Sequence, residues 1–144
     1  MMTINRLAAL AFCAGCALLP MWTEVASAHE GHSHGSANIV VPETAEGVLQ
    51  EIQKHHAAVS SAVNGRNLKA VHDHAEAMTA LAKALPAKVS DDRKTRVEGT
   101  TNNMTKLLDT LHHAADDGDQ PRSGIELKKL DGAVTTLEKQ LKAE

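Results

Sequence analysis

The segment LKKLDGAVTTLEKQL, residues 127–141, places its apolar side chains at alternating intervals of three and four residues. This heptad spacing lines up one apolar stripe along an α-helix, while Lys, Glu, Asp, Gln, Thr, Gly and Ala occupy the remaining positions. A helix of this kind is stable when its stripe packs against other helices. Just upstream, Ser123-Gly124-Ile125-Glu126 fits a capping box, so we expect this helix to begin at Ser123.

Three earlier segments show the same helical period, at residues 43–63, 68–85 and 90–118. Pro42 suits the first helical position of one, Asn67 is a candidate N-cap of the next, and Gly118 is a candidate C-terminal stop. No segment alternates as a strand would. Because short connections favour antiparallel neighbours, the sequence predicts an all-α fold, an up-down-up-down four-helix bundle over residues 42–144. The expected buried positions are Val48, Leu49, Ile52, Val59, Val63, Leu68, Val71, Ala75, Met78, Leu81, Leu85, Val97, Thr101, Met104, Leu108, Leu111, Ala115, Leu127, Leu130, Val134, Leu137 and Leu141.

The first 28 residues have the features of a cleaved signal peptide. A basic start is followed by the apolar run 7–19, and Ala26-Ser27-Ala28 supplies small residues at the cleavage spacing. The apolar run is shorter than the about 20 residues that a membrane-spanning helix needs. We therefore expect a periplasmic or secreted protein that is cleaved after Ala28 and is not embedded in a membrane.

Cleavage there would remove both cysteines, the single Phe and the single Trp, while all 9 histidines remain. The remaining chain would have no disulfide, no thiolate ligand and no aromatic ring on which bases could stack. The net charge of the whole chain is -3, which does not favour contact with phosphate backbones. We expect no nucleic-acid partner. Neither a nucleophile–base set nor a complete site for a metal-bound water is evident, so an enzyme is not expected.

Residues 29–41 are polar, contain glycine and lack periodicity, which predicts a flexible arm. Its HEGHSHG segment contains three histidines: His29, His32 and His34. If cleavage follows Ala28, the free amine and the imidazole of His29 could chelate one Cu(II) ion, with the other two imidazoles completing its coordination. The alternative is a solubilising leader whose histidines are incidental.

The remaining histidines form close pairs within the predicted helices: His55 and His56, His72 and His74, His112 and His113. With a rise of about 1.5 Å per residue, all three pairs fall in the same half of the predicted bundle. We therefore expect them to contribute to one region between helices, with the second helix as the bridge. Several have a carboxylate one turn away: Glu51 with His55, Glu76 with His72, Asp109 with His113, and Asp116 with His112.

Imidazole and carboxylate ligands without thiolate suit divalent transition metals, with Cu expected first and then Zn, Ni or Co. All nine histidines are candidate ligands. The alternative is that they are surface histidines in ordinary i,i+4 charge pairs. Met78 could support Cu(I) beside His74, although both helical methionines are better explained as core residues. Haem is not expected, because the CxxCH attachment motif is absent.

The segment AVHDHAEAM, residues 70–78, resembles the alanine-histidine-acid repeats of the small metal-binding protein family. More broadly, the chain resembles small exported bacterial metal-binding proteins that fold as histidine-bearing four-helix bundles. The chain departs from the family by having few such repeats and long apolar stripes. The resemblance implies metal binding by the histidine-rich helix.

Two classes of function remain open from the sequence. The first is a periplasmic buffer or carrier for Cu, Ni, Co or Zn, acting in metal homeostasis or heavy-metal resistance. Its candidate protein partners are a metal-efflux system or another periplasmic protein. The second is a helical adaptor or sensor domain without metal, whose histidines respond to pH.

Overall fold

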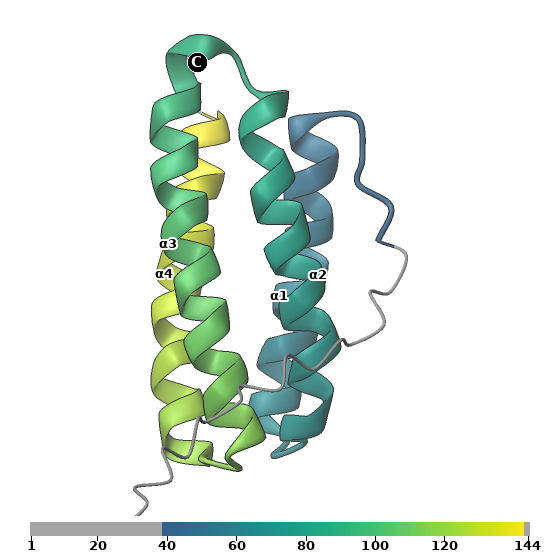
Figure 1. Ribbon diagram of the computed structural model, residues 1–144, viewed down its shortest axis with the longest axis vertical. Helices are drawn as coiled ribbons and strands as arrows, with labels where there is room; N and C mark the ends of the chain where they lie inside the picture. The colour runs from purple at the N-terminus through teal and green to yellow at the C-terminus, as the bar shows by residue number, and fades with distance from the viewer. Residues whose placement is uncertain (1–38, 143–144) are drawn as a thin grey trace, which may run out of the picture. The chain divides into compact units, whose positions relative to one another are not determined.

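The computed structural model describes residues 39–142, which form four α-helices joined by short connections (Figure 1). The helices are α1 (Ala45–Asn64), α2 (Val71–Ala84), α3 (Asp91–Asp116) and α4 (Gln120–Lys142). Two 3-10 turns, η1 (Leu68–Ala70) and η2 (Leu85–Lys88), precede and follow α2. No strand occurs within residues 39–142, so the all-α prediction is confirmed. The predicted signal peptide, residues 1–28, lies outside the described residues, as do residues 29–38 of the predicted arm.

Each helix packs against its neighbour in the chain, and α1 also packs against α4. Three hydrogen bonds connect helix ends. Gln120 at the start of α4 donates through Nε2 to the Val63 carbonyl near the end of α1 (2.6 Å). Arg93 near the start of α3 donates to the Leu141 carbonyl near the end of α4 (3.1 Å). Lys88, after α2, donates to the Glu43 carbonyl before α1 (3.5 Å).

The predicted apolar stripes form the core. All of the predicted positions are buried except Leu68 and Leu141, which are partly buried against the same core. Met78 and Met104 are both fully buried, so their thioethers fill space between Leu, Val, Ile and Ala side chains. Ile39 and Val41, which the sequence assigned to the arm, also pack partly buried against the core.

The first helix begins later than Pro42 suggested. Thr44 is the N-cap of α1, and its hydroxyl oxygen accepts a hydrogen bond from the backbone N–H of Gly47 (3.1 Å). This side-chain cap satisfies one of the unpaired N–H groups of the first turn, so it fixes the start at Ala45. Asn67 precedes η1 but makes no side-chain capping bond, and α2 itself begins at Val71. The prediction for Pro42 was therefore wrong. Asn67 does occupy the N-cap position before Leu68, but of the short 3-10 helix η1 that leads into α2.

The predicted start of the last helix at Ser123 is also wrong. Helix α4 begins at Gln120, because the Asp119 carboxylate accepts a hydrogen bond from the Arg122 backbone N–H (3.0 Å). Ser123 is buried within the first turn, where its hydroxyl donates to the Asp119 carbonyl (2.8 Å). Glu126, which the capping box assigned to the helix start, is buried and bonds instead to Lys129 (2.7 Å).

The ends of α1 and α3 have the same hydrogen-bond pattern, in which a residue with positive φ donates its N–H to the carbonyl three residues earlier: Arg66 to Val63 and Gly118 to Ala115. At the end of α3, Gly118 has φ +70, and its N–H bonds the Ala115 carbonyl (3.1 Å), as predicted for a C-terminal stop. At the end of α1, the residue with positive φ is Arg66 (φ 59) rather than the neighbouring Gly65. A side chain in this conformation costs free energy that glycine avoids.

Candidate metal centre

The two histidines of α2 point toward different neighbouring helices. Residues two apart on an α-helix are separated by about 200° around the axis, because each residue advances by about 100°. His72 contacts His112 of α3, whereas His74 contacts His55 of α1. The histidines predicted for one shared region therefore form two separate pairs, one on each side of α2.

The α2–α3 cluster consists of His72, Glu76, His112 and Asp116. Nδ1 of His72 and Nε2 of His112 are in close contact, and the two ring centroids lie 4.4 Å apart with an interplanar angle of 47°. Asp116 Oδ2 lies 3.5 Å from His112 Nε2. Glu76 Oε1 lies 3.5 Å from the other ring nitrogen of His72, Nε2. Each helix thus contributes one imidazole and one carboxylate.

The local sequence explains this symmetry. Both helices contain a histidine followed four residues later by an acid, and residues at this spacing share a helix face. His72 lies at the start of α2 and His112 lies in the last turns of α3. These two ends lie next to each other, so the two faces meet. The carboxylates are more exposed than the rings: the Asp116 side chain is 58% exposed and that of Glu76 37%.

Burial lowers the pKa of His112 below its usual value. The nearby carboxylate of Asp116 opposes this shift, while the neighbouring imidazoles of His72 and His113 add to it. At neutral pH the ring is therefore uncharged and retains a nitrogen lone pair. A neutral imidazole is the form that binds a metal ion.

The donor set fits a divalent transition metal. One ligand atom each from His72, His112 and Asp116 can be chosen so that all three lie within 4.8 Å of one another. A tetrahedral Zn(II) site with bonds of about 2.0–2.2 Å requires ligand separations of about 3.3 Å. The Asp116–His112 distance of 3.5 Å is near this value, whereas the closely contacting nitrogens of His72 and His112 would have to move apart by rotation of their rings. Glu76 is not one of these three ligands, because it lies at Nε2 of His72 while Nδ1 faces His112. Two nitrogen donors and one oxygen donor suit Zn, Co, Ni and Cu(II).

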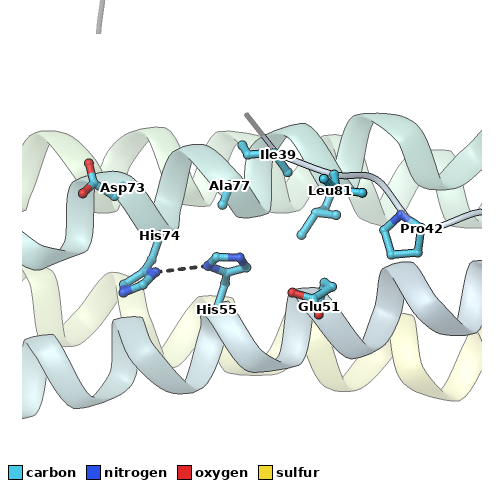
Figure 2. A pocket seen from close by; sticks show the side chains of 9 residues that line it. Ile39, Pro42, Glu51, His55, Asp73, His74, Ala77 and Leu81 are labelled. Atoms are coloured by element: carbon cyan, nitrogen blue, oxygen red, sulfur yellow. Dashed lines mark hydrogen bonds between the residues drawn. The ribbon is translucent and has the colours of Figure 1, made fainter. Parts of the chain in front are cut away.

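The α1–α2 pair consists of His55 and His74, whose Nδ1 atoms face each other at 3.0 Å (Figure 2). Their ring centroids lie 5.3 Å apart. The pair lines a cleft of about 520 Å³, whose other walls are formed by Ile39, Val40, Pro42, Glu51, Asp73, Ala77 and Leu81. Burial lowers the pKa of His55, and the adjacent His74 lowers it further against the opposing effect of Glu51.

The remaining histidines lie apart from these pairs. His56 Nε2 contacts Asp131 Oδ1 on α4 at 2.7 Å, which links α1 to α4. His113 is exposed, and its ring lies 5.7 Å from that of His112. Sequence reasoning missed Asp131, because a partner 75 residues away gives no local signal. His29, His32 and His34 lie outside the described residues, so their predicted role as ligands remains a prediction.

No protein-family model matches this chain, and no curated protein or solved structure is significantly similar to it. The resemblance to the small metal-binding protein family therefore rests on the segment 70–78 and remains a prediction. Within residues 39–142, none of the helices is both long enough and apolar enough to cross a membrane.

Proposed function

We propose that this protein binds a divalent transition metal ion at the α2–α3 cluster and acts as a buffer or carrier for Cu, Zn, Ni or Co in the periplasm. The observation that supports this proposal most directly is the convergence of His72, His112 and Asp116, with Glu76 beside them. Export after a cleaved signal peptide, metal homeostasis and heavy-metal resistance belong to the same proposal. The arm histidines would capture copper before the helical site does.

The exposure of the ligands suits a buffer better than a permanent structural site. His72 and His112 are mostly buried, with side chains 18% and 21% exposed, so they can hold a metal away from bulk water. The two carboxylates are open to solvent, which allows a competing chelator to approach. Affinity for this ligand set should follow the usual order of divalent metals, with Cu(II) highest.

The proposal includes an antiparallel up-down-up-down arrangement of the four helices. The contacts between the end of α1 and the start of α4, and between the start of α3 and the end of α4, support it. In that arrangement the start of α2 and the end of α3 lie at the same end of the bundle. This position lets the two His-x-x-x-acid segments face each other.

The test compares His72→Ala/His112→Ala with His113→Ala, in a full chain whose arm histidines His29, His32 and His34 are replaced by alanine. Zn(II) affinity is measured by competition with a chelator, and helicity by circular dichroism. We expect the double variant to lose at least about 100-fold in affinity, because two of the three candidate ligands are removed, while His113→Ala binds as the reference. Unchanged affinity in a folded double variant would exclude the cluster as the metal site.

A second candidate function is an adaptor or sensor that responds to pH without metal. The specific observation in its favour is the lowered pKa of both His55 and His112, one in each pair. The two functions differ in thermodynamic linkage. A metal-binding protein gains thermal stability when Zn(II) exceeds its dissociation constant, whereas a metal-independent adaptor does not.

A further inference from the structure

The two imidazoles of the α1–α2 pair are placed so that they could either share a hydrogen bond or bind one metal ion together. Nδ1 of His55 and Nδ1 of His74 face each other from adjacent helices at 3.0 Å (Figure 2). A hydrogen bond across this gap requires one ring to carry its proton on Nδ1 and the other to leave that nitrogen bare. If both rings carry their protons on Nε2, two lone pairs point into the same space. A metal ion bound between the rings would favour this state, in which both Nδ1 atoms are unprotonated.

The separation of the two nitrogens suits neighbouring positions around one ion. With bonds of about 2.0 Å, ligands at a right angle are about 2.8–2.9 Å apart, and tetrahedral ligands are about 3.3 Å apart. The observed 3.0 Å is closer to the right angle. Tetragonal coordination by nitrogen is characteristic of Cu(II) and Ni(II).

The pair differs from the α2–α3 cluster in its carboxylates. Within residues 39–142, neither His55 nor His74 forms an ion pair with an acid, whereas His72 and His112 each do. Two acids, Glu51 and Asp73, line the same cleft. The Glu51 carboxylate bonds to Lys54 (3.0 Å), and the Asp73 carboxylate points away from the two imidazoles (Figure 2). The protein therefore offers two nitrogen ligands here, and the other coordination positions face the cleft.

The cleft has room for the missing ligands. Its volume is about 520 Å³, and Ala77 and Leu81 of α2 form an apolar wall on one side of the imidazoles. A small bidentate chelator with an amine and a carboxylate would fill two neighbouring positions of a tetragonal ion. The apolar wall would then contact the rest of such a molecule.

We propose that His55 and His74 form a second metal site, which binds Cu(II) or Ni(II) together with a small amino-carboxylate chelator held in the cleft. This inference deepens the proposed metal-binding function and rests on it. The α2–α3 cluster would hold the metal with protein ligands alone. The α1–α2 pair would exchange metal with small chelates from solution, because the protein leaves half of the equatorial positions open.

The first test counts copper ions in the full chain with His29, His32 and His34 replaced by alanine. Equilibrium dialysis against Cu(II) should give two equivalents for this reference, one for His55→Ala/His74→Ala and one for His72→Ala/His112→Ala. His56→Ala is the matched control, since His56 neighbours His55 in the chain but contacts Asp131, and it should retain two. Circular dichroism checks folding, and His55→Gln/His74→Gln replaces any alanine variant that fails to fold.

The outcomes separate the two proposals. If His55→Ala/His74→Ala binds as much copper as the reference while His72→Ala/His112→Ala loses one equivalent, the second site is excluded and the proposed function stands. If only the His55 and His74 variant loses copper, the second site stands and the α2–α3 cluster is excluded. If neither variant loses copper, both are excluded.

The second test asks whether a small chelator fills the coordination positions that His55 and His74 leave open. Glycine is added to the copper-loaded His72→Ala/His112→Ala variant, and the Cu(II) electron paramagnetic resonance spectrum is recorded. We expect a saturable change in the spectrum while copper stays with the protein, and tighter saturation with leucine, whose side chain can contact the apolar wall. A spectrum that does not change, or copper that simply leaves with glycine, would exclude a shared coordination sphere.

Discussion

The two sides of α2 use the same residue type in different settings. On one side, His72 meets His112 with a carboxylate beside each ring. On the other side, His74 meets His55 beside an open cleft and without a paired acid. Two histidines separated by a single residue in the sequence are thereby given different ligand environments. What distinguishes the two histidine pairs is the acid one turn further along each helix, which accompanies His72 and His112 but not His55 and His74.

The largest expected effect is on stability, and it comes from a buried residue of α2, the helix that carries both His72 and His74. Met78 of α2 is fully buried, and replacing it by alanine leaves a cavity. We expect Met78→Ala to lower the free energy of unfolding by about 2–5 kcal/mol, measured by urea denaturation. Lys83→Ala, an exposed change on the same helix, should have an effect below about 0.5 kcal/mol. A small effect of Met78→Ala would mean that the two sides do not share a rigid scaffold.

The next effect tests the role of the carboxylates. We expect Glu76→Gln/Asp116→Asn to weaken Zn(II) binding at the α2–α3 cluster by about 10–100-fold, because the ligand charge is lost while the shape is kept. Glu51→Gln, on the other side of α2, should leave this affinity unchanged. Isothermal competition titration against a chelator measures both. Equal losses in the two variants would show that the acids act only through the overall charge.

A smaller effect is expected from pH in the metal-free protein. Burial lowers the pKa of His55 and His112, so below about pH 6.5 the unfolded chain binds more protons than the folded chain. Stability should therefore be retained above pH 6.5 and decrease as the pH falls below it. His55→Gln/His112→Gln should flatten this decrease in melting temperature between pH 7 and 5. If the decrease is the same in the variant, other groups cause the acid response.

The smallest effect concerns the connection that brings α1 to α2. Arg66 has φ 59, which costs a side-chain-bearing residue more than glycine. Arg66→Gly should raise the free energy of unfolding by about 0.5 kcal/mol, since relief of this strain exceeds the added freedom of the unfolded chain. Chemical denaturation measures the change, with the exposed Lys69→Gly as a control that should be neutral or destabilising. The number of bound copper ions should not change.

The helical period predicted the core residues well, because the sequence of each helix determines which of its faces is apolar. Helix starts were harder to predict. Both Asp119 and Ser123 can cap a helix, and Asp119 prevails because Pro121 fits the first turn and does not interrupt it. The rise per residue placed the histidine pairs at a similar height. Whether His72 faces α3 or α1 depends on the rotation of α2 about its axis, which the packing of all four helices determines.

The core contains Leu, Val, Ile, Ala and Met, and residues 39–142 include no Phe, Tyr or Trp. Imidazoles are therefore the only aromatic rings in this part of the chain. In a proton magnetic resonance spectrum of the chain after the predicted cleavage, the carbon-bound aromatic protons should come only from its nine histidines, six of which lie in the helices. Each ring can then report its own protonation and its own encounter with a paramagnetic ion, without isotopic labelling.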